Sequence, residues 1–160
     1  MKTHSDYFDE VTRCMMSFQY IEEALKMVLV RLESLTYFRL RGYTHYDLKP
    51  KIDSIQNAAM GRLIDFLKIY TDDPKLIEDL KVVKKQRDLI AHQSLLMTVE
   101  QLKDDDFIQL KFSELEKVKE CSNSLLMKIC DRYKDLDKTL NTIAAEPIAA
   151  ANRSPAAGSR

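Results

Sequence analysis

The sequence predicts an all-α protein built as a bundle of four to five helices. Helix breakers are few, with three Gly and four Pro in 160 residues, and residues that favour helices, such as Leu, Lys, Glu, Ile and Met, are abundant. Apolar residues recur at steps of three and four, the spacing that places side chains on one face of a helix. A chain of this length can bury one core, so we expect a single domain over residues 1–143.

The first helix is expected over residues 6–38, because one apolar stripe runs through this segment. Glu22 falls inside the stripe, between Phe18 and Leu25. A carboxylate in that place needs a partner. We therefore expect Glu22 either to pair with a cation in the core or to lie at a tilted edge of the helix.

A loop and a second helix are expected next. Residues 39–50 contain Gly42, Pro50 and three polar-tipped rings, which favours a loop whose rings either cover the core or contact a ligand. The rings are those of Tyr43, His45 and Tyr46. The second helix is expected over residues 51–70, where Gly61 lowers helix propensity and indicates the close approach of another helix.

The third helix begins at a strong start signal, the Asp-Pro pair at 73–74, and is expected to extend to residue 96. Residues 97–112 end in alternating apolar and polar side chains, which predicts a short β-hairpin. A final helix is expected from Ser113, which opens a capping-box pattern. Residues 144–160 are rich in Ala, Pro and Ser, and we expect them to form a disordered tail.

Charge and cysteine content exclude several classes of protein. Lys and Arg together number 25, and Asp and Glu together also number 25, so the formal net charge is zero. The protein is therefore not a general polyanion binder, and any nucleic-acid contact needs a local basic patch. Three cysteines without a CxxC pair and three scattered histidines favour neither a disulfide framework nor a zinc site, and we expect no metal or cofactor. With no apolar signal core and no apolar run approaching the roughly 20 residues that cross a bilayer, a cytoplasmic protein without membrane contact is expected.

Arg87 points to the middle of the apolar side of the third helix, the side that carries Leu80 and Val83. An unpaired charge in a core is strongly destabilising. Arg87 therefore needs an acidic partner such as Glu22, an exit to the surface along its apolar stem, or a polar cleft.

A polar ridge on another face of the same helix holds Lys81, Lys85, Asp88 and His92. Asp88 and His92 are one turn apart, so the carboxylate can orient the imidazole. The alternative is an ordinary solvated face with a helix ion pair. Arg87 and His92 together suffice for RNA cleavage without a metal, because an arginine fork holds a phosphate while histidine moves protons.

Residues 87–92, Arg-Asp-Leu-Ile-Ala-His, resemble the Arg-x4-His signature of HEPN domains (higher eukaryotes and prokaryotes nucleotide-binding). In that family a polar residue often follows the Arg, as Asp88 does here. The order of helices is also similar over residues 6–142, with a long first helix, the motif on the third and a long last helix. The resemblance implies a metal-independent endoribonuclease of the toxin or phage-defence type.

The resemblance also implies a homodimer in which two motif helices face each other across a two-fold axis. In such a dimer Arg87 would hold the scissile phosphate, His92 would act as general acid and base, and Asp88 would orient His92. The lysines that would contact the RNA backbone are Lys81, Lys84 and Lys85.

An antitoxin or a nucleotidyltransferase partner is a further implication of the resemblance. In members controlled by a nucleotidyltransferase, a Tyr two residues after the His is modified, whereas this chain has Ser94 there. Two alternatives stay open. One is a HEPN-like binding or dimerisation module without catalysis, and the other is an unrelated helical bundle for protein interaction, in which Arg87 pairs with Glu22 inside one monomer.

Overall fold

A computed structural model describes residues 3–41, 43, 45–93 and 97–151. All of the secondary structure in these residues is helical, which confirms the all-α fold class. The helices are α1 (His4–Leu40), α2 (Leu48–Gln56), α3 (Met60–Tyr70), α4 (Pro74–Gln93), α5 (Val99–Lys103) and α6 (Asp105–Ala151).

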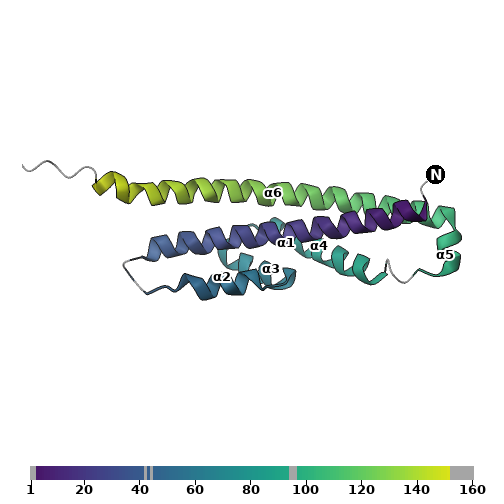
Figure 1. Cartoon of the computed structure of the whole chain (residues 1–160), viewed down its shortest axis with the longest axis horizontal. Coiled ribbons are helices and arrows are strands. Elements are labelled where there is room, and N and C mark those ends of the chain that lie inside the picture. The colour runs from purple at the N-terminus through teal and green to yellow at the C-terminus, as the bar shows by residue number, and fades with distance from the viewer. Residues whose placement is uncertain (1–2, 42, 44, 94–96, 152–160) are drawn as a thin grey trace, which may run out of the picture.

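The two long helices, α1 and α6, run parallel and side by side along the molecule (Figure 1). Ion pairs mark their register, with Glu10 bound to Lys119 near one end and Arg31 2.8 Å from Asp137 further along. The parallel arrangement follows from the connection, because α2, α3 and α4 carry the chain back along the other side of α1 (Figure 1). No helix in the described part of the chain is both long and apolar enough to cross a membrane.

The core lies where α1, α3, α4 and α6 meet. The apolar stripe predicted for the first helix forms its centre, and the fully buried side chains there include Phe18, Ile21, Leu25 and Leu29 of α1. Each such side chain contributes about 1.5–3 kcal/mol by leaving water. The opposing helices supply Leu63, Leu67, Leu80 and Ile129.

Glu33 is a buried acid on α1 that ties the connection after α1 to the core. Its carboxylate accepts hydrogen bonds from the hydroxyls of Tyr46 and Tyr70. Tyr46 is therefore partly buried over the core, one of the two outcomes expected for the rings of this segment. Tyr43 and His45 are exposed instead.

The helix predicted over residues 51–70 is divided into α2 and α3. The division falls at Asn57, whose side-chain amide donates a hydrogen bond to the Asp53 carbonyl oxygen at 2.8 Å and so competes with helix continuation. The close approach predicted at Gly61 is confirmed. A Cβ atom there would lie 3.3 Å from Cε of Lys84 on α4.

The β-hairpin predicted over residues 97–112 is wrong, because the described residues of this segment form α5 and the start of α6. Ile108 and Phe112 are buried and Leu110 is exposed. That alternation also suits a helix, where residues four apart share a face. The helix begins before Ser113, since the Asp104 carboxylate accepts a hydrogen bond from the Phe107 backbone N–H at 3.0 Å.

The last helix continues past the boundary expected at residue 143. It extends through residues 144–151, which were expected to be disordered. Alanine, abundant in this stretch, has the highest helix propensity, and a helix that is already formed needs no new nucleus. Residues 152–160 of the expected tail lie outside the described residues.

Candidate functional site

Helix α4 carries the candidate site and is held at both its start and its inner face. The Asp73 carboxylate caps it, accepting a hydrogen bond from the Leu76 backbone N–H at 3.0 Å, and Pro74 is the first helical residue. Leu80 and Val83 are buried in the core. These contacts fix the rotation of α4 about its axis, and therefore the directions of its polar side chains.

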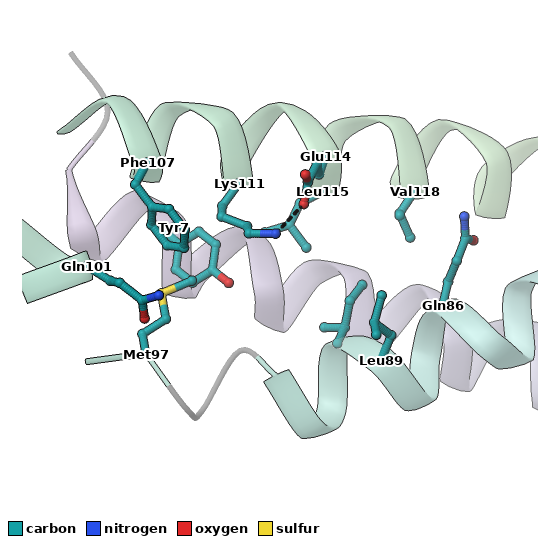
Figure 2. Close-up of a pocket in the computed structure, with 11 residues that line it drawn as sticks. Tyr7, Gln86, Leu89, Met97, Gln101, Phe107, Lys111, Glu114, Leu115 and Val118 are labelled. Atoms are coloured by element: carbon teal, nitrogen blue, oxygen red, sulfur yellow. Dashed lines mark hydrogen bonds and ion pairs between the residues drawn. The ribbon is translucent and has the colours of Figure 1, made fainter. Parts of the chain in front are cut away.

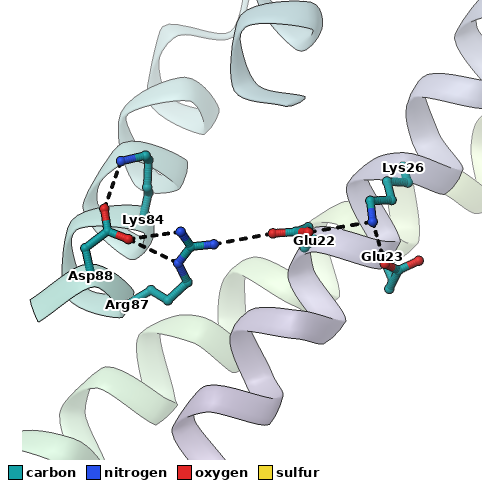
Figure 3. A network of polar contacts seen from close by, with 6 residues as sticks. All are labelled: Glu22, Glu23, Lys26, Lys84, Arg87 and Asp88. Atoms are coloured by element: carbon teal, nitrogen blue, oxygen red, sulfur yellow. Dashed lines mark hydrogen bonds and ion pairs between the residues drawn. The ribbon is translucent and has the colours of Figure 1, made fainter. Parts of the chain in front are cut away.

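Arg87 lies at the edge of the α1–α4 contact and keeps 29% of its side chain exposed. Its Nη1 atom is 3.4 Å from Oε2 of Glu22 on α1, while Nε and Nη2 donate to Oδ1 of Asp88 at 3.2 and 3.0 Å (Figure 3). Glu22 thus pairs with a cation, one of the two alternatives expected for it, although the pair is partly exposed rather than inside the core. Glu22 and Asp88 both bind the guanidinium that was predicted to hold a phosphate.

Asp88 is shared between two cations of its own helix. Its Oδ2 atom is 2.8 Å from Nζ of Lys84, and its Oδ1 atom binds Arg87 (Figure 3). The hydrogen bond from Lys84, followed by those from Arg87, lowers the pKa of Asp88 below its ordinary value. Asp88 is therefore a carboxylate at neutral pH and acts as an acceptor for both side chains.

The ion pairs continue across α1 into one network of six charged groups (Figure 3). Lys26 bridges two carboxylates, at 3.6 Å from Glu22 and 2.7 Å from Glu23. Three cations and three carboxylates take part, so the network has no net charge. A phosphate that binds Arg87 must therefore compete with carboxylates already in place.

His92 lies one turn beyond Asp88 and is exposed. Within the described residues no hydrogen bond joins its imidazole to Asp88, whose partners are Lys84 and Arg87. The role predicted for Asp88 in orienting His92 is therefore without a supporting contact. The structure places Asp88 beside Arg87 instead.

The three lysines predicted to contact RNA differ in their surroundings. Lys84 is bound to Asp88, and Lys81 is 3.6 Å from Glu78 in an exposed pair. Lys85 is exposed and has no ion-pair partner among the described residues. Lys85 is thus the most available of the three for a phosphate.

Two apolar residues that were absent from the predicted site share the outer face of α4 with Lys85 and His92. The exposed fraction is 46% for Val82 and 51% for Leu89. The four positions follow one another at steps of three and four, so they form one stripe on the solvent side. The signal in the sequence was the seven-residue interval between Val82 and Leu89, which repeats one helix face.

Comparisons of the chain with protein-family models, with curated proteins and with solved structures find no match.

Proposed function

We propose that this chain is a metal-independent endoribonuclease of HEPN type that acts as a homodimer through α4. The observation that supports this best is the placement of Arg87 and His92. Both reach solvent from the C-terminal half of one helix. A guanidinium fork that binds phosphate and an imidazole that exchanges protons near neutral pH are the groups RNA cleavage requires.

The proposed reaction is an internal transesterification. The 2′ oxygen of one nucleotide attacks the neighbouring phosphorus, and the bond from phosphorus to the 5′ oxygen of the next nucleotide breaks. His92 takes the proton from the 2′-hydroxyl and returns a proton to the leaving 5′ oxygen, while Arg87 binds the phosphate oxygens on which charge builds. The products are a 2′,3′-cyclic phosphate and a 5′-hydroxyl, with no change in oxidation state.

The exposed apolar residues of α4 support a dimer with this helix at its centre. Val82 and Leu89 would lose water on contact with the same face of a second copy, and a two-fold interface repeats each contact. Such an interface would bring two copies of Arg87 and His92 to one groove. Lys81, Lys84 and Lys85 would then supply a local positive rim on a chain of zero net charge.

This proposal requires the Arg87 guanidinium to give up at least one of its ion pairs with Glu22 and Asp88 when RNA binds. Arg87 contacts both Glu22 and Asp88 before RNA arrives. Phosphate must displace at least the longer contact, the one to Glu22. A toxin or phage-defence effector under the control of an antitoxin or nucleotidyltransferase is the biological role that this activity would serve.

The proposal is tested by cleavage of a labelled RNA mixture in EDTA. Parent protein is compared with Arg87→Ala and His92→Ala, and with Arg39→Ala and His45→Ala as matched controls at exposed positions away from α4. We expect cleavage by the parent and by both controls, and loss of at least about 100-fold in rate for each site variant. Intact RNA with the parent, or equal rates for all five proteins, contradicts the proposal.

One observation favours a second candidate, a helical interaction module without catalysis. The Arg87–Glu22 ion pair lies within a single chain, so Arg87 has a partner without a second copy or RNA. This candidate predicts intact RNA in the assay above, together with self-association or partner binding that survives Arg87→Ala. Both candidates allow self-association in Arg87→Ala, so cleavage of RNA by the parent protein is the result that separates them.

A further inference from the structure

A cavity of about 550 Å³ lies where α4, α5, α6 and the start of α1 come together (Figure 2). Its volume falls within the range of roughly 300–1,000 Å³ that is usual for small-molecule sites. Most of its wall is apolar, with contributions from Leu89, Ile90, Met97, Phe107, Leu115 and Val118. An apolar molecule would therefore gain from leaving water here.

The charged groups that line this cavity cancel each other. Nζ of Lys111 is 2.7 Å from Oε2 of Glu114, and the same Nζ lies 5.9 Å from the centre of the Phe107 ring. An anionic ligand would meet the Glu114 carboxylate, and a cationic one would meet Lys111. Charge complementarity therefore favours an uncharged occupant.

The cavity wall holds two polar groups without a hydrogen-bond partner among the described residues, the buried Oε1 atom of Gln86 and the hydroxyl of Tyr7. The side chain of Tyr7 is enclosed, with only 3% of the residue exposed, and its hydroxyl points into the space between Met97 and Leu89 (Figure 2). No atom of the described residues hydrogen-bonds to this hydroxyl, which leaves it free to donate to a molecule in the cavity. Burial and the nearby Glu114 charge raise the pKa of Tyr7, so the hydroxyl remains a donor.

We infer that this cavity binds an uncharged, largely apolar small molecule with a carbonyl oxygen that accepts a hydrogen bond from the Tyr7 hydroxyl. The inference does not depend on the catalytic roles proposed for Arg87, Asp88 and His92, although Leu89 belongs both to the cavity wall and to the proposed dimer contact. Leu89 and Ile90 place the ligand against the helix that carries those three residues.

Two probes of the same shape test the inference. 2-Acetylnaphthalene has the required carbonyl, and 2-isopropenylnaphthalene replaces its oxygen with a methylene group. Dissociation constants are measured by titration of the full chain with methionine methyl groups labelled for NMR. We expect both probes to bind and to shift the Met97 signal, while the signal of Met27, which does not line the cavity, stays in place.

Two variants complete the test. Tyr7→Phe removes one oxygen atom without repacking the core. We expect it to weaken binding of the ketone about fivefold and to leave binding of the hydrocarbon unchanged. Val118→Phe adds volume inside the cavity, and we expect it to weaken both probes at least tenfold. Failure of both probes to bind the parent, or an equal effect of Tyr7→Phe on the two, overturns the inference. Because Tyr7→Phe leaves the core volume intact, the test holds even if Val118→Phe does not fold.

Discussion

Arg87 of α4 and Glu22 of α1, which are 65 residues apart in the sequence, form an ion pair between the two helices. The Nη1–Oε2 distance is 3.4 Å, and the two side chains remain 29% and 24% exposed. The pair joins the candidate site to α1, whose apolar stripe lies in the core. It also decides how readily the guanidinium can reach a phosphate.

Substitution of Glu22 should release Arg87. We expect Glu22→Gln to change the free energy of unfolding by less than about 1 kcal/mol, because partly exposed ion pairs contribute little. RNA affinity should rise several-fold, since phosphate no longer competes with this carboxylate. Filter binding in EDTA measures the affinity.

Glu23→Gln is the matched control for this prediction, because it removes the same charge from the neighbouring position, where the side chain is 66% exposed. An equal rise in affinity for both variants would show that only overall charge matters. That result would contradict a specific competition at Arg87.

Asp88 should make stability depend on pH in the acid range. Hydrogen bonds from Lys84 and Arg87 lower its pKa in the folded state. Its contribution is therefore complete above the ordinary aspartate pKa of about 3.9 and is lost as pH falls through the lower folded value. Asp88→Asn should cost about 0.5 kcal/mol at pH 7, a small value because the side chain is 38% exposed.

Urea unfolding of Asp88→Asn and the parent at a series of pH values measures this effect. The difference in unfolding free energy should shrink as the solution becomes more acidic. A difference that stays constant down to the acid limit of folding would contradict the assignment of these ion pairs.

The stability of the fold should depend on the hydrogen bonds to the buried Glu33 carboxylate. Tyr70→Phe removes one of its two hydroxyl donors, and hydrogen bonds to charged groups contribute about 1.5–3 kcal/mol. Burial and the bond to Glu33 raise the pKa of Tyr46 to about 12, so the other donor stays protonated throughout the test. Tyr20→Phe, at an exposed position, is the control. Equal urea midpoints for Tyr70→Phe and Tyr20→Phe would contradict this account.

The outer face of α4 should control self-association. We expect Leu89→Glu to shift the protein to monomers in sedimentation velocity and to lower nuclease activity in parallel, because it places a charge in the proposed apolar contact. Leu110→Glu makes the same change on α6, where the side chain is 59% exposed, and should leave association unchanged. Dimers that persist in Leu89→Glu would exclude this face as the interface.

The helices of this protein could be predicted from the sequence where a regular spacing of apolar residues continues over several turns. The apolar stripe of α1 followed from periodicity, and the start of α4 at Pro74 followed from the Asp-Pro start signal. Charge burial gave an acidic partner as one of three alternatives for Arg87, and the structure has that one. Residues 97–112 could not be assigned in this way, because the apolar positions Ile108 and Phe112 suit both a strand and a helix. In the structure the segment is helical, and the Asp104 carboxylate caps the start of α6 by accepting a hydrogen bond from the Phe107 backbone N–H.

The remaining differences concern tertiary contacts. Asp88 is close in sequence to both Arg87 and His92, and only the side-chain positions show that it binds Arg87 and Lys84. The cavity beside Tyr7 is formed by four separate helices, so no local pattern indicates it.

The chemical nature of RNA ends released in EDTA tests the central claim most directly. Mass spectrometry of a short RNA substrate after incubation with the parent should show 2′,3′-cyclic phosphate and 5′-hydroxyl ends, which Arg87→Ala and His92→Ala should not produce. Intact RNA with the parent, or the same ends from all three proteins, would contradict a nuclease site built on Arg87 and His92.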